Sequence, residues 1–281
     1  MAGPAKKQRR KNSLLRDTVV RSVEITRYAI RRGQPDKDEP VLTTGRNVAF
    51  FEAGVANWRF DLKSPDLLAP SPERPPLVAV EATWLTAQQA LERGIAVVSG
   101  SSANTFGAMG TLLVPPGFHI PTVTATARNV LYYGLQLVES GSDLAVATAH
   151  YPIAMMEYDY TAAYKQHFLM KKHGGGGVFL ETHDFPHIHI PTSAACGGYI
   201  VIGKAVAPGE YHFTAFRIPF GSALYTPSNT IHGDGTLVGT YALTVADPAL
   251  TTADTVLVYN RETRAMARDV VPDWTPSEKN P

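Results

Sequence analysis

The pattern of hydrophobic and polar positions changes along the chain, and the change separates an N-terminal arm from a longer body. Within residues 13–32, apolar residues recur at loosely helical spacing between a candidate N-cap, Ser13, and a candidate stop, Gly33. This spacing predicts one amphipathic helix. Beyond about residue 40, short runs of β-branched and aromatic residues alternate with Gly, Pro, Ser or Asn clusters, which is typical of strands joined by turns.

These runs predict an all-β body, because short and evenly spaced strands with few helical stretches indicate a sandwich or a barrel. One helical patch, residues 86–93, interrupts them and stops at Gly94. The predicted strands are 47–52, 77–81, 95–99, 111–114, 129–138, 144–149, 178–182, 199–206, 211–219, 236–246 and 255–259.

Composition excludes several classes of protein. A chain of 281 residues predicts one large domain or two small ones. The single cysteine, Cys196, excludes a disulfide framework and a CxxC-type zinc or redox site. No window approaches the ~18 consecutive apolar residues of a membrane span. The charged N-terminus lacks the apolar centre of a secretory signal, so we expect a cytoplasmic protein.

The near-zero net charge is an average over two unlike parts. Residues 1–33 hold ten basic and two acidic side chains, a balance of +8, which leaves −7 for the other 248 residues. A basic arm can bind nucleic acid or anionic lipid. This run is short and lacks the interleaved aromatic residues of a stacking surface, so nucleic acid is not the expected partner. We expect a solvated tail, or an arm that docks on its own acidic body or on a second subunit.

Candidate chemistry is concentrated in the histidines, eight of which lie between residues 150 and 232. The sharpest segment is HDFPHIHIP, residues 183–191. On a strand, alternate residues project from one face, so His187 and His189 can share one metal ion. Forty-three residues after His189 comes a second segment, GSALYTPSNTIH, which ends at His232.

The two segments resemble the paired motifs of the cupin superfamily, G-x5-H-x-H-x3–4-E-x6-G and G-x5-P-x-G-x2-H-x3-N. His187 and His189 match the first motif; Gly221, Pro227 and His232 match the second. The resemblance covers about residues 165–260. It implies a jelly-roll barrel with one divalent transition metal held by His187, His189 and His232.

The segments also depart from the family pattern. Asn229 stands where the family usually has Gly, and Thr236 where it has Asn. No Glu lies at residues 192–194, where the family places a carboxylate ligand. Cys196 falls in that position if the loop is longer; otherwise it is a small buried hydrophobe.

In the family that the chain resembles, members with three histidine ligands include non-haem iron dioxygenases. Members with an added Glu ligand include oxidases, isomerases and decarboxylases. The missing Glu favours a mononuclear Fe(II) dioxygenase or oxygenase, although Zn, Ni, Mn and Cu suit the same ligands. Neutral ligands leave the charge of the ion intact, which favours a small, polar, anionic substrate. The alternatives are a metal-dependent isomerase or lyase of a small acid or sugar derivative, and a non-catalytic ligand-binding cupin.

Three further residues are candidates for roles around the metal. Tyr225 and His183 are candidate catalytic residues that move protons or orient a ligand, and Arg217 is a candidate substrate-binding residue that holds a carboxylate. His183 and Cys196 are also possible fourth contacts of the metal. Their alternatives are a barrel-wall aromatic, a histidine at the barrel mouth and an ordinary surface charge.

The predicted organisation has four parts: a basic helical arm (1–38), a β-rich region that is either a degenerate first barrel or an extension of the functional one (39–160), a metal-binding barrel (161–262) and a C-terminal tail (263–281). Because cupin-like barrels often pair through exposed strands, we expect a homodimer.

Overall fold

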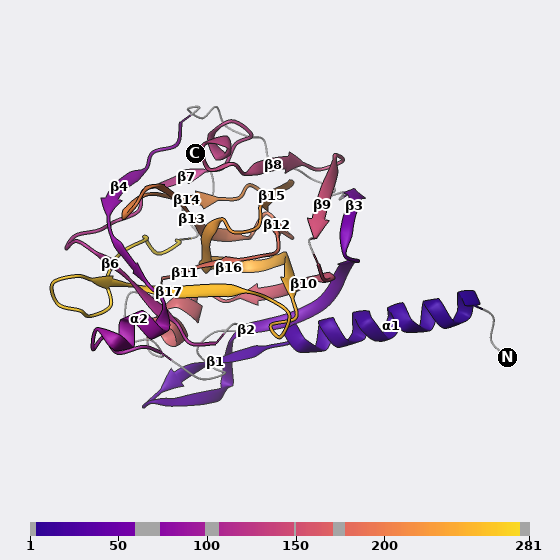
Figure 1. Cartoon of the computed structure of the whole chain (residues 1–281), viewed down its shortest axis with the longest axis horizontal. Helices are drawn as coiled ribbons and strands as arrows, with labels where there is room; N and C mark the ends of the chain where they lie inside the picture. Colours follow the sequence, from indigo (N-terminus) through magenta and orange to yellow (C-terminus); the bar gives the residue numbers. More distant parts are fainter. Residues whose placement is uncertain (1–3, 60–73, 99–106, 149, 171–177, 276–281) are drawn as a thin grey trace.

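The structure is a computed structural model that describes residues 4–59, 74–98, 107–148, 150–170 and 178–275 (Figure 1). It is mostly β, with 53% strand and 14% helix, which confirms the all-β class. The helices are α1 (Pro4–Val23) and α2 (Ala87–Glu92), with a 3-10 helix at Asn129–Tyr133 and a π-helix at Tyr164–Leu169. The strands are β1 (Thr26–Arg31), β2 (Gln34–Phe51), β3 (Gly54–Arg59), β4 (Val78–Glu81), β5 (Thr83–Leu85), β6 (Gly110–Val114), β7 (Thr122–Thr124), β8 (Gln136–Glu139), β9 (Asp143–Thr148), β10 (Ile153–Tyr160), β11 (Phe179–His183), β12 (His187–Pro191), β13 (Gly197–Ala207), β14 (Glu210–Arg217), β15 (Ser222–Thr226), β16 (Ile231–Ala246) and β17 (Ala253–Asn260).

The long strand β16 joins two groups of strands. Its first half pairs with β11 and β13, and its second half pairs with β10 and β12. The partners change near Gly239, whose φ of 99° and close approach to Cys196 both require glycine. One group therefore runs β1-β2-β10-β16-β12-β15-β8, and the other runs β5-β6-β17-β11-β16-β13-β14 (Figure 1).

This network is compatible with a cupin, and the jelly-roll topology itself stays a prediction. Strands β2 and β10 of the predicted N-terminal region belong to the same sheet as β12 and β16 of the predicted barrel. The two regions therefore share backbone hydrogen bonds. Buried side chains from both regions also meet in common hydrophobic clusters.

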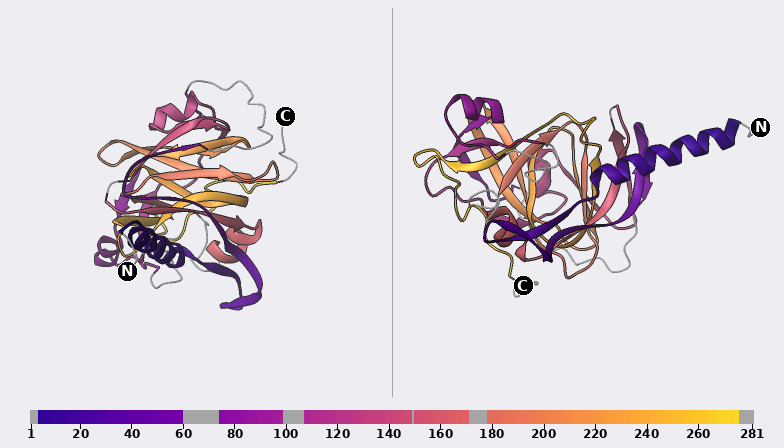
Figure 2. Two further views of the ribbon diagram at one scale, coloured as in Figure 1. Left: turned by 90° about the vertical axis from the view of Figure 1, so that its right-hand side faces the viewer. Right: turned by 90° about the horizontal axis from the view of Figure 1, so that it is seen from below.

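The N-terminal arm differs from its prediction. The helix predicted over residues 13–32 ends at Val23, and Thr26–Arg31 form β1, antiparallel to β2. Residues 26–31 alternate β-branched or aromatic side chains with others, which favours a strand once β2 offers an edge. Val19 and Val23 are buried and anchor the end of α1. The rest of the helix extends away from the sheets (Figures 1 and 2).

Other elements follow the predicted pattern with local differences. The predicted strand 129–138 is a 3-10 helix that ends at Gly134, followed by β8, and residues 95–98 contribute one isolated bridge at Val98. The helix predicted over 86–93 is confirmed as α2, with a capping box between Thr86 and Gln89. None of the described helices combines the length and apolar character that a bilayer span requires.

The C-terminal segment packs on the sheets as far as it is described. Val270 and Val271 are buried, and Lys165 Nζ lies 2.7 Å from an Asp273 carboxylate oxygen. Trp274 covers Gly197, where a Cβ atom would lie 2.1 Å from the indole ring. The last six residues of the predicted tail, 276–281, lie outside the described residues.

Candidate metal centre

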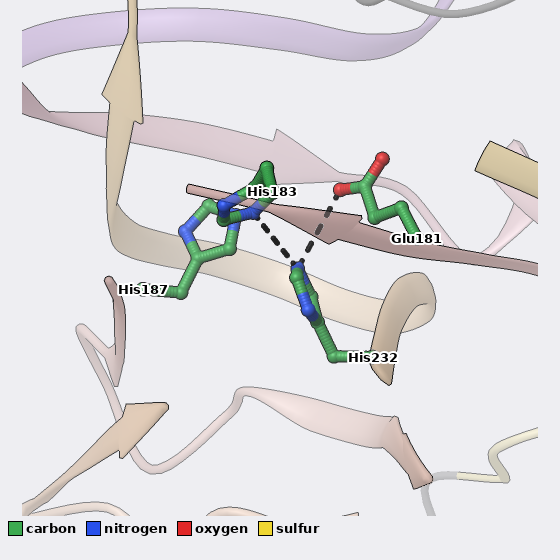
Figure 3. A group of neighbouring side chains, drawn as sticks. All are labelled: Glu181, His183, His187 and His232. Carbon is green, nitrogen blue, oxygen red and sulfur yellow. Dashed lines mark hydrogen bonds and ion pairs between the residues drawn. The ribbon is translucent and has the colours of Figure 1, made fainter. Parts of the chain in front are cut away.

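Four buried side chains from three strands converge on one point. Glu181 and His183 come from β11, His187 from β12 and His232 from β16 (Figure 3). Glu181 and His183 project from the same face because they are two residues apart on a strand. Glu181 is paired directly with His232 across β11 and β16. One potential ligand atom from each residue lies within 4.8 Å of the others.

The outer nitrogens of the histidines are held by acceptors on the protein. His183 Nδ1 donates to the Phe185 carbonyl at 2.8 Å, and His232 Nδ1 donates to the Thr230 carbonyl at 2.9 Å. A carbonyl oxygen only accepts, so this assignment places the hydrogen on Nδ1 and leaves a lone pair on Nε2 of each neutral ring. Hydrogen bonds of this kind commonly fix the orientation of metal-binding histidines.

The spacing of these inner atoms fits a cation. His183 Nε2 lies 3.2 Å from His232 Nε2, which in turn lies 3.6 Å from Glu181 Oε1. Two lone pairs at this distance repel each other unless a proton or a cation lies between them. Neighbouring ligands of an ion with bonds of about 2.0–2.2 Å are separated by roughly 2.8–3.1 Å in octahedral and roughly 3.3–3.6 Å in tetrahedral geometry. The separations of 3.2 and 3.6 Å lie within the span of these two geometries, so the donor set suits a metal ion.

Burial controls protonation at the cluster. Burial, with the neighbouring His232, lowers the pKa of His183 to about 3, and burial with His183 and His189 holds the pKa of His187 well below its usual value. Burial also opposes protonation of His232, but the hydrogen bond and charge of Glu181 raise its pKa overall. Neutral imidazole is the form that binds metal, so His183 and His187 are ready ligands at neutral pH.

His189 lies beside the cluster without joining it. Its ring centroid is 4.8 Å from that of His187, and the side chain is 0% exposed. Neither of its ring nitrogens has a hydrogen-bond partner among the described residues. Burial, together with His232 and His183, lowers its pKa to about 3. The structure thus brings His187 and His232 together with His183, and leaves His189 as an adjacent, unpartnered imidazole.

The other predicted site residues lie elsewhere. Tyr225 is paired with Ile188, so its side chain projects from the opposite face of the sheet to His187 and His189. Arg217 lies over the Trp274 ring, 5.6 Å from its centroid, and does not line the cavity beside the cluster. Cys196 is buried and donates from Sγ to the Thr240 carbonyl at 3.1 Å, so it is not a ligand in this arrangement.

A cavity of about 70 Å³ adjoins the cluster. Its polar walls come from Glu181 and His187 on one hand and from Arg27, Tyr160 and Tyr164 on the other. Tyr160 donates a hydrogen bond of 2.6 Å to Asp234, which also lines the cavity. The remaining lining residues are Val23, Ile25, Leu42, Tyr158, Phe179, Leu243, Val245 and Ala246.

Glu181 and Arg27 are the residues that sequence reasoning missed. The carboxylate precedes the histidine pair instead of following it, and its available signal was the Glu-Thr-His alternation at residues 181–183 on a predicted strand. In comparisons with known proteins, no family model, no curated protein and no solved structure matched the chain. What is shown is therefore a mostly β protein with a buried group of side chains that can bind a metal.

Proposed function

We propose that the chain is a mononuclear metal-dependent enzyme that acts on a small polar molecule. Glu181, His183, His187 and His232 would hold the ion, and the adjoining cavity would admit the substrate. One observation carries this proposal: the Nε2 atoms of His183 and His232 converge with the Glu181 carboxylate at metal-ligand spacing. The Nδ1 atoms of both histidines are already hydrogen-bonded to backbone carbonyls.

Fe(II) and oxygen chemistry are the first choice for this site. The finding of Glu181 removes the sequence-based reason for preferring an oxygenase, namely the lack of a carboxylate. It supplies a different reason, because two histidines and one carboxylate with open positions are typical of non-haem Fe(II) oxygenases, and four protein ligands would still leave two positions open on a six-coordinate ion. The bound ion would supply redox and Lewis-acid chemistry; Zn, Ni, Mn and Cu also suit these donors.

The chain's own residues would hold the reactants and exclude water. Apolar side chains such as Phe179, Leu243 and Val245 line the cavity and limit solvent entry. His189 is buried beside His187 but is not among the residues that line the cavity, so it would act only through the neighbouring His187 ring. Glu181 is further held by Thr255, whose hydroxyl donates to Oε2 at 3.4 Å.

The first experiment measures metal content. Purified protein is analysed for bound metals and compared with His183→Ala and with His150→Ala, which replaces an exposed histidine away from the cluster. We expect about one ion per chain in the wild type and in His150→Ala, and loss of the ion in His183→Ala. A metal-free wild type that stays metal-free in Fe(II), Zn(II) and Mn(II) would refute the proposal.

The reaction class is then decided by oxygen. The Fe(II)-loaded protein is incubated with a set of small carboxylic acids, with and without O2, and both O2 consumption and product are measured. An oxygenase consumes O2 in step with product and makes none without it. A second candidate, Lewis-acid isomerase or lyase chemistry, is favoured by the Tyr160–Asp234 pair, which can move a proton in the cavity. That reaction would continue without O2.

A further inference from the structure

We propose that Arg27 and Tyr164 form an anion-binding subsite that holds the carboxylate of a small monoanionic substrate in the cavity beside the metal cluster. The inference rests on the proposed function and adds a substrate class to it. It assigns a role to a residue of the basic N-terminal arm, which composition alone treats as a solvated or docking segment.

Arg27 is placed where it can contact a ligand in the cavity. Arg27 lies on β1, is half-buried, and lines the same cavity as Glu181 and His187. Its guanidinium carbon lies 5.3 Å from the ring centroid of Phe168 and 5.8 Å from that of Tyr164. A cation over two aromatic rings is held in place, because the rings attract it and restrict its motion.

Arg27 has more hydrogen-bond donors than the described residues use. Arg27 Nη1 donates to the Tyr164 hydroxyl, and this is the one side-chain hydrogen bond of Arg27 among the described residues. A guanidinium has five N–H donors, so several remain for a ligand. No carboxylate oxygen of the described residues lies within 4.0 Å of an Arg27 nitrogen. The carboxylate of Asp234 lines the same cavity and attracts Arg27 electrostatically without a direct ion pair, so the remaining guanidinium donors can still bind a ligand.

Tyr164 adds a second donor at the same place. Its oxygen accepts from Arg27, and no acceptor is found for its own hydroxyl hydrogen among the described residues. Tyr164 belongs to the π-helix Tyr164–Leu169, an element that is rare in proteins and frequent at functional sites. Arginine and phenol donors converging on one side of a cavity are suited to the two oxygens of a carboxylate.

Asp234 limits the charge of the ligand. Its carboxylate lines the cavity and accepts the hydrogen bond from Tyr160. A second negative charge on the ligand would meet Asp234 or Glu181, whereas a single carboxylate can lie against Arg27 with its remaining atoms toward the cluster. The cavity volume of about 70 Å³ also selects a molecule of few atoms. The subsite therefore fits a small monocarboxylate.

The test compares acetate with acetamide, which has nearly the same shape and no charge. Binding of each probe to the full-length protein is measured by calorimetry, once with Co(II) loaded and once after chelation. The variants are Arg27→Met, Tyr164→Phe and, as the matched control, Arg46→Met. Arg46 is an exposed arginine on β2 that pairs with Glu157 outside the cavity.

We expect the wild type and Arg46→Met to bind acetate more tightly than acetamide. Arg27→Met should weaken acetate binding by about 10- to 100-fold, the usual effect of losing charge-assisted hydrogen bonds, and leave acetamide unchanged. Tyr164→Phe should weaken acetate binding less, and it serves as the test if Arg27→Met does not fold. Equal acetate affinity in Arg46→Met and in whichever cavity variants fold would overturn the subsite.

The two metal states separate this proposal from the proposed function. If Co(II) does not bind but acetate still depends on Arg27, the subsite stands and the metal enzyme fails. If Co(II) binds with normal stoichiometry and acetate is indifferent to Arg27 and Tyr164, the subsite fails and the metal centre stands.

Discussion

Replacing Glu181 by glutamine tests whether Glu181 is a metal ligand or only a structural partner of His232. The substitution keeps the shape of a side chain that is 6% exposed and removes the one formal negative charge among the four converging groups. In a metal site this charge stabilises the ion directly. In a metal-free cluster Glu181 would serve only as a polar neighbour of His232, whose Nε2 lies 3.6 Å from Oε1, and a glutamine oxygen can occupy the same place.

The expected size of the effect follows from linkage between binding and folding. Metal supplied at a hundred times its dissociation constant stabilises the native state by about 2.7 kcal/mol. For a chain of this size that corresponds to a rise in Tm of roughly 5 °C, at about 2 °C per kcal/mol. Outer-shell partners already change metal affinity by about 10- to 100-fold, so we take about 100-fold for a direct ligand. At the same metal concentration the stabilisation of Glu181→Gln then falls to about 0.4 kcal/mol, a shift of less than about 1 °C.

Thermal unfolding with metal and after chelation provides the assay. Glu157→Gln is the matched control, because it makes the same chemical change in a half-buried carboxylate on β10 that pairs with Arg46. We expect the full metal-dependent rise in Tm for the wild type and Glu157→Gln, and nearly none for Glu181→Gln. A full rise in Glu181→Gln, or an equal loss of stability with and without metal, would show that Glu181 is only structural.

Three further predictions follow from single contacts. His189→Leu should keep one metal per chain in elemental analysis, since four other side chains converge; loss of the ion would instead support the ligand set implied by the cupin resemblance. Thr244→Val removes a buried hydroxyl that donates to a backbone carbonyl at 2.9 Å and lies 3.5 Å from His187 Nδ1. Urea unfolding should show that the free energy of unfolding falls by about 1–3 kcal/mol, and chelator competition should show about 10-fold weaker metal binding. Unchanged values for both would contradict the assigned contacts. The hydrogen bond from His167, followed by that from Arg31, lowers the pKa of Glu39 below 4.5, so its contribution to stability is present above pH 4.5 and is lost as the pH falls through the lowered value. Urea unfolding of Glu39→Gln and wild type across pH 3–7 should therefore converge at the acid end, and a constant difference would be inconsistent with this linkage.

The sequence predicts the all-β class and two of the converging residues as ligands, His187 and His232, with His183 as a possible fourth contact, because strand alternation and motif spacing are local properties. The cupin resemblance places the carboxylate ligand after His189, whereas Glu181 precedes the histidine pair in the sequence. Its partnership with His232 depends on the pairing of β11 with β16, and register between distant strands is not readable from one sequence.

Arg27 illustrates a second limit. The spacing of residues 13–32 is consistent with a helix, and the same residues include an alternating run that becomes β1 when β2 supplies its edge. Tertiary pairing overrides a weak helical preference in such a case. The consequence is chemical as well as structural, because β1 lines the cavity and the predicted continuation of the helix would have given Arg27 a different environment.

The dependence of the cluster on β16 bears on how the protein would acquire its ion during synthesis. A nascent chain that has emerged only as far as β12 holds Glu181, His183 and His187 but no fourth ligand. The site is complete only after His232 has been made and β16 has paired on both sides, with strands that begin as early as residue 153. Metal capture would therefore be among the last events of maturation, and the metals available in the compartment at that moment would determine which one is enclosed. Once enclosed by side chains that are at most 6% exposed, the ion would leave only when these strands separate, so the initial choice of metal would persist for the life of the folded molecule.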